Sequence, residues 1–438
     1  MRNNIVHQGA GELSYEIRGI VEKAEKLQEL GVKIFWENIG DPVAKGEKIP
    51  DWIKDIVKKE IESDRSFAYS PTKGILETRK FLAEICNNKG GVKITPDDIV
   101  FFNGLGDAIS KIYTYLNRSS RVIGPSPAYP THSSAEASHS GSHHITYRLM
   151  PENGWLLDLD ELEDKIRSNP AISGILIINP NNPTGTVYSR ETVGKIVEIA
   201  KKYDLFIVSD EIYSRIVYDG SKEVASLAEV IGETPGIAMK GISKEFPWPG
   251  ARCGWIEVYN RDKDPLFSRY IKSIIDAKML EVCSTTLPQL VIPKITTDPR
   301  YEIHLNEKNE RYGRKAEIVS IILKNTEGII VPKTEGAFYM SIVFKNGTLN
   351  VRQKLKIENK EAKKFVEKII KNALPDKRFV YYLLGATGIC LVPLSSFNSD
   401  LLGFRLTLLE SDEEKFKWII ETIAEKIKEY LLSSPSQS

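Results

Sequence analysis

One lysine and one arginine lie close together in the stretch GISKEFPWPGARCGW, which covers residues 241–255. Lys244 is a primary amine, and an amine becomes a nucleophile for carbonyl carbons when its pKa falls toward neutrality. Arg252, eight residues later, is a permanent cation that can bind a phosphate through two hydrogen bonds. The pair therefore allows a reactive amine beside a bound anion. Because the chain contains 60 lysines and arginines, this spacing alone is equally compatible with an ordinary surface turn.

Other strings in the chain could complete such a site. In NPNNPTG, residues 179–185, Asn182 stands between prolines after an apolar run. Asparagine and proline are common in turns for conformational reasons alone, but an asparagine held in this way is also a rigid hydrogen-bond donor. In NGLGDAIS, a glycine-rich turn opens a predicted helix, so the amides of Leu105 and Gly106 would face an anion. Asp210 ends the apolar run LFIVSD, where a helix cap is the ordinary interpretation.

At NPNNPTG the chain resembles the fold type I, class I and II pyridoxal-phosphate-dependent aminotransferases. The resemblance covers most of the chain, because separated motifs occur in the order of that family. These motifs are YSPTKGILETR, NGLG, SPAYP, NPNNPTG, VSDEIY, SKEF with PGAR, and GFRLTLLES. The resemblance implies that the cofactor is pyridoxal 5′-phosphate and that the protein is an enzyme, a transaminase.

The resemblance assigns the catalytic residues. Lys244 matches the lysine that forms a Schiff base with the cofactor and then acts as general acid and base. Asp210 matches the carboxylate that faces the pyridine nitrogen, and Tyr213, together with Asn182, would bind the phenolic oxygen of the ring.

The resemblance also assigns binding residues. Arg252 would bind the cofactor phosphate, and Arg405 would bind the substrate carboxylate. Tyr69 matches a tyrosine that reaches the phosphate of a neighbouring subunit, which implies a homodimer with shared sites. Further cofactor contacts are expected from Leu105, Gly106, Tyr129 (stacked on the ring) and Ser243, and further substrate contacts from Gly40 and Asn182.

The implied reaction is a ping-pong transamination between an L-amino acid, with alanine favoured, and a 2-oxo acid, with 2-oxoglutarate expected. The segments YEIRGIV, ENIGDP and GFRLTLLES resemble the alanine aminotransferase branch. Arg18 is a candidate cation for a distal carboxylate. Aspartate, aromatic and branched-chain amino acids stay open as substrates.

Two other classes of function are also compatible with parts of the sequence. A lyase or synthase on the same scaffold would keep Lys244 and Asp210 without exchanging an oxo acid. A non-catalytic regulator would need a DNA-binding module, and the segment before NIGDP contains no basic helix-turn-helix pattern.

The elements that must position these residues are strands alternating with helices. Apolar runs from about residue 98 are separated by helical patterns such as RETVGKIVEIAKKYD, which predicts an α/β protein with a mainly parallel, seven-stranded sheet covered by helices. In such sheets, ligands bind at the carboxyl ends of the strands. The candidate residues that follow strand-like runs are Gly104, Tyr129, Asn182, Asp210 and Lys244.

Two domains are expected: a large cofactor-binding domain of residues 45–305, and a smaller α+β domain of residues 1–44 and 306–438. A charged stretch near residues 345–376 departs from the family pattern. The balance of 60 basic and 59 acidic residues gives no reason to expect nucleic acid or a membrane as partner. Four widely spaced cysteines suggest neither a disulfide framework nor a metal site. With no long apolar run, the expected location is the cytoplasm.

Overall fold

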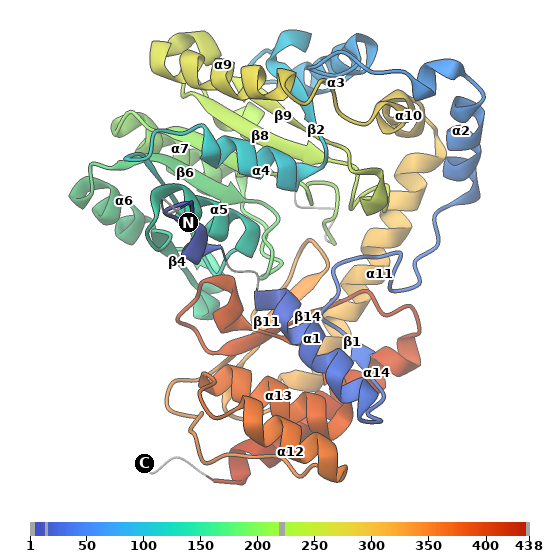
Figure 1. Cartoon of the computed structure of the whole chain (residues 1–438), viewed down its shortest axis with the longest axis vertical. Helices are drawn as coiled ribbons and strands as arrows, with labels where there is room; N and C mark the ends of the chain where they lie inside the picture. The colour runs from blue at the N-terminus through green and yellow to red at the C-terminus, as the bar shows by residue number, and fades with distance from the viewer. Residues whose placement is uncertain (1–4, 14–15, 219–223, 435–438) are drawn as a thin grey trace.

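The structure of the chain is a computed structural model that describes residues 5–13, 16–218 and 224–434. Figure 1 shows a sheet with its covering helices in one part and a group of helices with small sheets in the other. The strands are β1 Phe35–Trp36, β2 Ile99–Phe102, β3 Arg121–Ser126, β4 Thr146–Met150, β5 Leu156–Leu157, β6 Ile172–Ile178, β7 Phe206–Asp210, β8 Gly236–Gly241, β9 Gly254–Tyr259, β10 Ile329–Ile330, β11 Tyr339–Phe344, β12 Ile389–Cys390, β13 Val392–Pro393 and β14 Gly403–Thr407. The α-helices are α1 Glu16–Glu29, α2 Asp51–Ile61, α3 Leu76–Asn88, α4 Leu105–Thr114, α5 Pro130–Ser140, α6 Leu159–Ser168, α7 Arg190–Lys202, α8 Leu227–Val230, α9 Pro265–Met279, α10 Thr286–Thr296, α11 Arg300–Leu323, α12 Lys360–Ile369, α13 Pro375–Thr387 and α14 Glu413–Leu432.

The large sheet has the strand order β2-β9-β8-β7-β6-β3-β4-β5. Strands β8, β7, β6, β3 and β4 run parallel, whereas β9 is antiparallel to both of its neighbours and β5 is antiparallel to β4. The prediction of a mainly parallel sheet is confirmed. All seven predicted strands are present, and the two-residue strand β5 adds an eighth at the edge.

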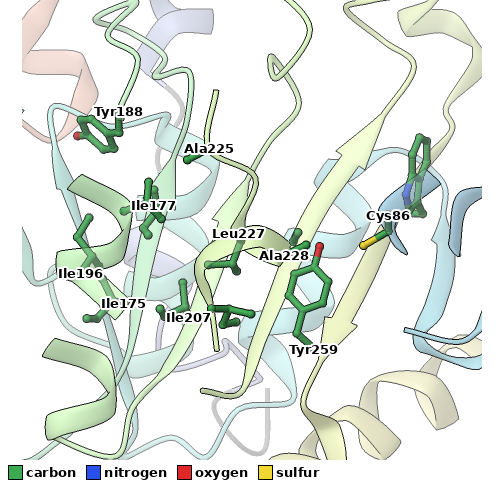
Figure 2. Close-up of a cluster of buried hydrophobic side chains, with 14 of the residues drawn as sticks. Cys86, Ile175, Ile177, Tyr188, Ile196, Ile207, Ala225, Leu227, Ala228 and Tyr259 are labelled. Carbon is green, nitrogen blue, oxygen red and sulfur yellow. The ribbon is translucent and has the colours of Figure 1, made fainter. Parts of the chain in front are cut away.

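Both faces of this sheet are buried, which explains why its strands are apolar without alternation. On β6, Ile175 and Ile177 pack on one face, and Leu176 and Ile178 pack on the other. Figure 2 shows the first face, where Ile196 of α7 lies beside Ile175. Helices α4 and α9 cover the opposite face.

The second apolar core lies among the C-terminal elements. It combines α13 and α14 with strands β10, β11 and β14 of the four-stranded sheet β10-β11-β14-β13, and residues of α1 also belong to it. The charged stretch near residues 345–376 forms a loop and then α12, whose Ala362 and Val366 are buried in the same core. Its charges are therefore those of an amphipathic surface helix. Among the described residues, no helix is long and apolar enough to cross a bilayer.

Candidate active site

A cavity of about 320 Å³ opens at the carboxyl edge of the large sheet. The parallel strands bring their ends to this edge, as predicted, and the segment around Gly40 and two strands of the C-terminal part close the cavity. The predicted site residues that line it are Gly40, Leu105, Gly106, Tyr129, Asn182, Asp210, Tyr213, Ser243, Lys244, Arg252 and Arg405.

Lys244 is half-buried and lies just after β8, where the strand leaves the sheet. Its Nζ donates a hydrogen bond of 2.8 Å to the carbonyl oxygen of Gly40. The rings of Phe338 and Tyr213 lie 5.4 and 6.0 Å from the same nitrogen. The amine is thus enclosed by aromatic rings and a backbone carbonyl.

The pKa of Lys244 is lowered to about 8. Burial is the main cause, and the positive charges of Lys308, Arg405 and Arg252 act in the same direction, whereas Asp41 opposes them. Roughly a tenth of the amine is therefore unprotonated at pH 7, far more than for an ordinary lysine, and the free amine is the form that a nucleophile requires.

One corner of the cavity is built for an anion. Arg252 donates to the backbone oxygens of Pro249, at 3.1 Å, and of Asn103, at 3.4 Å, which hold its guanidinium beside the start of α4. Gly104, the N-cap of α4, has a φ of +82°, and a Cβ there would lie 2.4 Å from Nη2 of Arg252. Only glycine lets the arginine approach the first amides of the helix so closely. Their positive ends and the guanidinium together favour a phosphate.

Asp210 is a buried carboxylate at the end of β7. Its Oδ1 accepts the amide of Ile212 at 3.1 Å, and its Oδ2 lies 3.1 Å from Nε2 of His132. His132 is fully buried in α5, and its Nδ1 lies 3.4 Å from the hydroxyl of Tyr113. The sequence analysis missed His132, whose only signal was its place three residues after Tyr129.

Tyr213 and Tyr339 form a buried pair of phenols at the cavity wall. The Tyr213 hydroxyl donates to that of Tyr339 at 3.2 Å, and burial raises the pKa of Tyr213 far above its ordinary value. Tyr213 is therefore a neutral donor. A Cβ on Gly40 would lie 2.1 Å from the Tyr339 hydroxyl, so this wall also depends on a glycine. Tyr339 is not among the site residues predicted from the sequence.

Arg405 is buried in β14, between β11 and β13. Its guanidinium donates to the carbonyl oxygen of Asn38, and at 3.4 Å to Oδ1 of Asn182. The ring of Tyr339 lies 4.4 Å from the guanidinium carbon. These contacts orient a second cation toward the cavity, on the side supplied by the C-terminal part.

Two of the predicted residues do not line this cavity. Tyr69 is 84% exposed on the surface of the chain. Arg18 is exposed near the start of α1. Tyr15, which opens the YEIRGIV segment, lies outside the described residues.

The site fits pyridoxal phosphate, the cofactor implied by the sequence resemblance. Its phosphate matches the corner made by α4, Gly104 and Arg252. A buried carboxylate, Asp210, is available for the pyridine nitrogen, and Lys244 supplies an amine of lowered pKa. Each chemical group of the cofactor therefore has a complementary group in the cavity wall.

Comparisons with known proteins give consistent results. Residues 38–423 match the family model described as aminotransferase class I and II. The chain is 59% identical to an uncharacterized aminotransferase of Methanocaldococcus jannaschii, over 98% of this chain and all of the relative. It is 30% identical to the glutamate-pyruvate aminotransferase AlaA of Escherichia coli, over 74% of this chain and 79% of that protein. The solved structure of an alanine aminotransferase from Pyrococcus furiosus superposes with a TM-score of 0.83 at 27% identity, covering 98% of this chain and all of the other.

Proposed function

This chain belongs to the aminotransferase class I and II family, and we propose that it moves an amino group between L-alanine and a 2-oxo acid, with 2-oxoglutarate as the acceptor, by a ping-pong reaction. The observation that carries this proposal is the place of Lys244. Its amine faces a cavity with two separate cations, Arg252 and Arg405, for two separate anions. An amino acid bound to a phosphate-bearing cofactor presents two such anions.

The cofactor of this aminotransferase is pyridoxal 5′-phosphate. When bound, it supplies an aldehyde that bonds to amines and a ring that takes up the electron pair left on the α-carbon of the amino acid. In our proposal, Arg252 and the amides of Leu105 and Gly106 hold the phosphate, with Ser243 beside them. Tyr129, which also lines the cavity, would stack on the ring.

The residues around the ring control its charge. Asp210 would keep a proton on the pyridine nitrogen, and His132, at 3.1 Å, holds the carboxylate in place. Tyr213 and Asn182 would donate hydrogen bonds to the ring oxygen, since Tyr213 is a neutral phenol. Negative charge that develops during the reaction is thereby stabilised.

Lys244 has a second role as the acid and base. Nζ of Lys244 would remove the proton from the α-carbon of the bound substrate and return it as an acid. A base with a pKa of about 8 holds enough free amine near neutral pH for this step. The Gly40 carbonyl, which accepts a hydrogen bond from Nζ, keeps the amine aimed into the cavity.

Arg405 would bind the α-carboxylate of the substrate, with Asn182 and the backbone of Gly40 beside it. Among the described residues that line the cavity, the cations are Lys244, Arg252 and Arg405. These three cations all have assigned roles. Alanine needs no further cation in this wall, whereas the second carboxylate of glutamate and of 2-oxoglutarate has no assigned partner among these lining residues. The names of AlaA and of the Pyrococcus furiosus enzyme also support alanine.

A half-reaction screen tests the substrate assignment. The purified enzyme with its cofactor is mixed separately with L-alanine, L-glutamate, L-aspartate, L-tyrosine and L-leucine, and with D-alanine as control. We expect alanine and glutamate to change the absorbance of the bound cofactor and to yield pyruvate and 2-oxoglutarate, measured by mass spectrometry. Faster conversion of aspartate, tyrosine or leucine would replace the alanine assignment. If no amino acid yields an oxo acid, a lyase or synthase becomes the better assignment.

We also propose that the enzyme is a homodimer with shared sites. The exposed apolar side chains Phe67, Tyr69, Met279, Leu280 and Val282 come from two segments that hydrogen bonds hold together. Exposed apolar groups that gather in this way are typical of an interface. Thr285, in the second segment, donates to the backbone oxygen of Arg252 at 3.2 Å, so the surface adjoins the phosphate corner.

Mixed dimers test this assignment. If Tyr69 completes the site of the other subunit, Tyr69→Ala and Lys244→Ala dimers are each impaired, but a mixed dimer contains one intact site. Coexpression in equal amounts should restore about one quarter of the wild-type activity per subunit, because half of the dimers are mixed and each has one working site. Activity that equals the mean of the two separate variants would contradict a shared site. Light scattering gives the oligomeric state independently.

The chain is predicted to form two domains, and α11 contacts the apolar cores of both. We propose a boundary near residue 305, because Tyr301 and Leu305 of α11 pack in the core around the large sheet. Tyr312 and Ala316 of the same helix pack in the C-terminal core. The active site would then lie between two bodies that are connected by α11 and by the chain near residues 44–45.

A further inference from the structure

A second buried lysine lies behind the catalytic one. Lys308 is 0% exposed, and its Nζ donates a hydrogen bond of 2.6 Å to the carbonyl oxygen of Lys244. The same nitrogen lies 3.3 Å from Oε1 of Glu47. Lys308 does not line the cavity, and the mechanism above does not use it. A buried ammonium is costly to a protein unless it is paired and hydrogen-bonded, so its place needs an explanation.

The position of Lys308 on α11 gives the first part of that explanation. The helix runs from the core of the large sheet, where Leu305 packs, to the C-terminal core, where Tyr312 packs. Lys308 lies between these two residues. It therefore contacts the catalytic lysine at the point where the helix passes from one core to the other.

Glu47 supplies the negative charge that pairs with the buried Lys308. It belongs to the segment that begins at Gly40, and its amide donates to the carbonyl oxygen of Pro42 at 2.9 Å. Its Oε2 accepts a hydrogen bond of 2.7 Å from the hydroxyl of Tyr312. Burial alone would raise the pKa of Glu47, but Lys308, Tyr312 and Arg311 outweigh it and lower the pKa. Glu47 is therefore ionised and serves as counter-ion to Lys308.

These contacts connect both the side-chain amine and the backbone carbonyl of Lys244 to one network of hydrogen bonds and ion pairs. Its Nζ is bound to the Gly40 carbonyl, and its backbone carbonyl is bound to Lys308. Lys308 is in turn bound to Glu47, seven residues after Gly40. We propose that Lys308 is a positioning residue that fixes Lys244 through its carbonyl oxygen and, by its nearby positive charge, keeps the Lys244 amine reactive, with Glu47 as its counter-ion. This inference rests on the proposed role of Lys244.

The charges around both lysines determine in which direction the pKa of Lys244 should change when Lys308 is replaced. The charged groups acting on Lys244 are Asp41, Lys308, Arg405 and Arg252, and Tyr213 faces its amine. Those acting on Lys308 are Glu47, Arg311 and Glu245, and burial together with the charge of Lys308 lowers the pKa of His304. Removing the positive charge of Lys308 removes one of the effects that lower the pKa of Lys244. The pKa of Lys244 should therefore rise.

The test is Lys308→Met, which keeps the length of the side chain and removes its charge and donors. In the full-length enzyme with cofactor, absorbance is titrated against pH, since the cofactor is bound through the Lys244 nitrogen. We expect the midpoint to move up by about one pH unit in Lys308→Met. Lys315→Met is the matched control, because Lys315 is also a buried lysine of α11 but donates to the carbonyl oxygens of Leu408 and Glu410 instead. It should leave the midpoint unchanged.

A second measurement does not depend on substrate or turnover. The full-length chain stripped of cofactor is labelled briefly with acetic anhydride at pH 7.5, and Lys244 is quantified by mass spectrometry against other lysine peptides. Labelling of Lys244 should be about tenfold slower in Lys308→Met, because each unit of pKa changes the free-amine fraction about tenfold. If the half-reaction screen fails while this difference is observed, the substrate assignment is wrong and the positioning role stands.

A double variant separates this role from a purely structural one. Lys308→Met removes the nearest counter-ion of the buried Glu47 charge and leaves that charge with Arg311, 3.6 Å away, so the thermal midpoint of the variant should fall. Lys308→Met/Glu47→Gln removes that charge and keeps an acceptor for Tyr312, so the thermal midpoint should recover. We expect the absorbance midpoint to stay raised in the double variant. If the thermal midpoint and the absorbance midpoint both return to their wild-type values in the double variant, Lys308 is not a positioning residue for Lys244. The same conclusion follows if Lys308→Met changes neither the absorbance midpoint nor the labelling.

Discussion

Lys244→Ala should lower kcat for the exchange between alanine and 2-oxoglutarate by about 10⁴-fold or more. Acid–base catalysis by one residue contributes about 10²–10⁴-fold, and this substitution also removes the covalent anchor of the cofactor. The cavity cannot replace the amine, because its remaining cations are arginines, which stay protonated. The measurement is pre-steady-state oxo-acid formation by the variant loaded with cofactor, together with steady-state kcat.

Lys244→Arg is the matched variant for this prediction. It keeps a positive charge near the Gly40 carbonyl but supplies neither a nucleophile nor a base. Both variants should keep the phosphate corner and bind the cofactor, because Arg252 and α4 are unchanged. Residual activity above about 1% of wild type in either variant would show that another group performs the proton transfer, and Lys244 would then lose its assigned role.

Arg405→Met should raise KM for alanine and for its oxo acid by about 10²–10³-fold, with a smaller change in kcat. The guanidinium is buried and held by Asn38 and Asn182, so a carboxylate paired with it is shielded from water. Truncating one partner of such a pair costs about 2–5 kcal/mol. Steady-state kinetics with each substrate varied separately measure the loss.

Arg252→Met provides the contrasting variant. Its guanidinium lies at the phosphate corner beside Gly104, so its loss should weaken cofactor binding and leave KM for alanine nearly unchanged at saturating cofactor. Arg405→Met should instead raise KM for alanine and leave cofactor binding nearly unchanged. If Arg405→Met weakened cofactor binding while leaving KM unchanged, the assignment of the two anion sites would be reversed. Arg405→Lys should recover little, because an ammonium lacks the planar pair of donors.

Most of the candidate site could be predicted from the sequence, because it lies at strand ends. Asn182, Asp210 and Lys244 each follow an apolar run, and parallel strands bring their carboxyl ends to one edge. The buried strands could be recognised for the same reason, since helices cover both sheet faces. The positions of these residues needed only the local pattern and one topological rule, whereas their roles came from the resemblance to the family. The role of Tyr69 stays a prediction.

The supporting residues could not be found in this way. His132 contacts Asp210 across 78 residues of sequence, Tyr213 contacts Tyr339 across 126, and Lys308 contacts Lys244 across 64. None of His132, Tyr339 and Lys308 belongs to a local motif that indicates which residue it contacts. A lysine in the helical pattern of NEKNERYGRK is ordinarily solvated, and nothing near it in the sequence indicates burial.

The sequence, through its resemblance to the family, therefore indicated the chemistry: which side chains supply an amine, a carboxylate and two cations. Only the tertiary structure decided how those groups are tuned. The pKa of Lys244 depends on burial and on charges from α11 and β14, which lie far from it along the chain. Electrostatic effects depend on distance in space and on exclusion of water, and both arise only when the chain is packed.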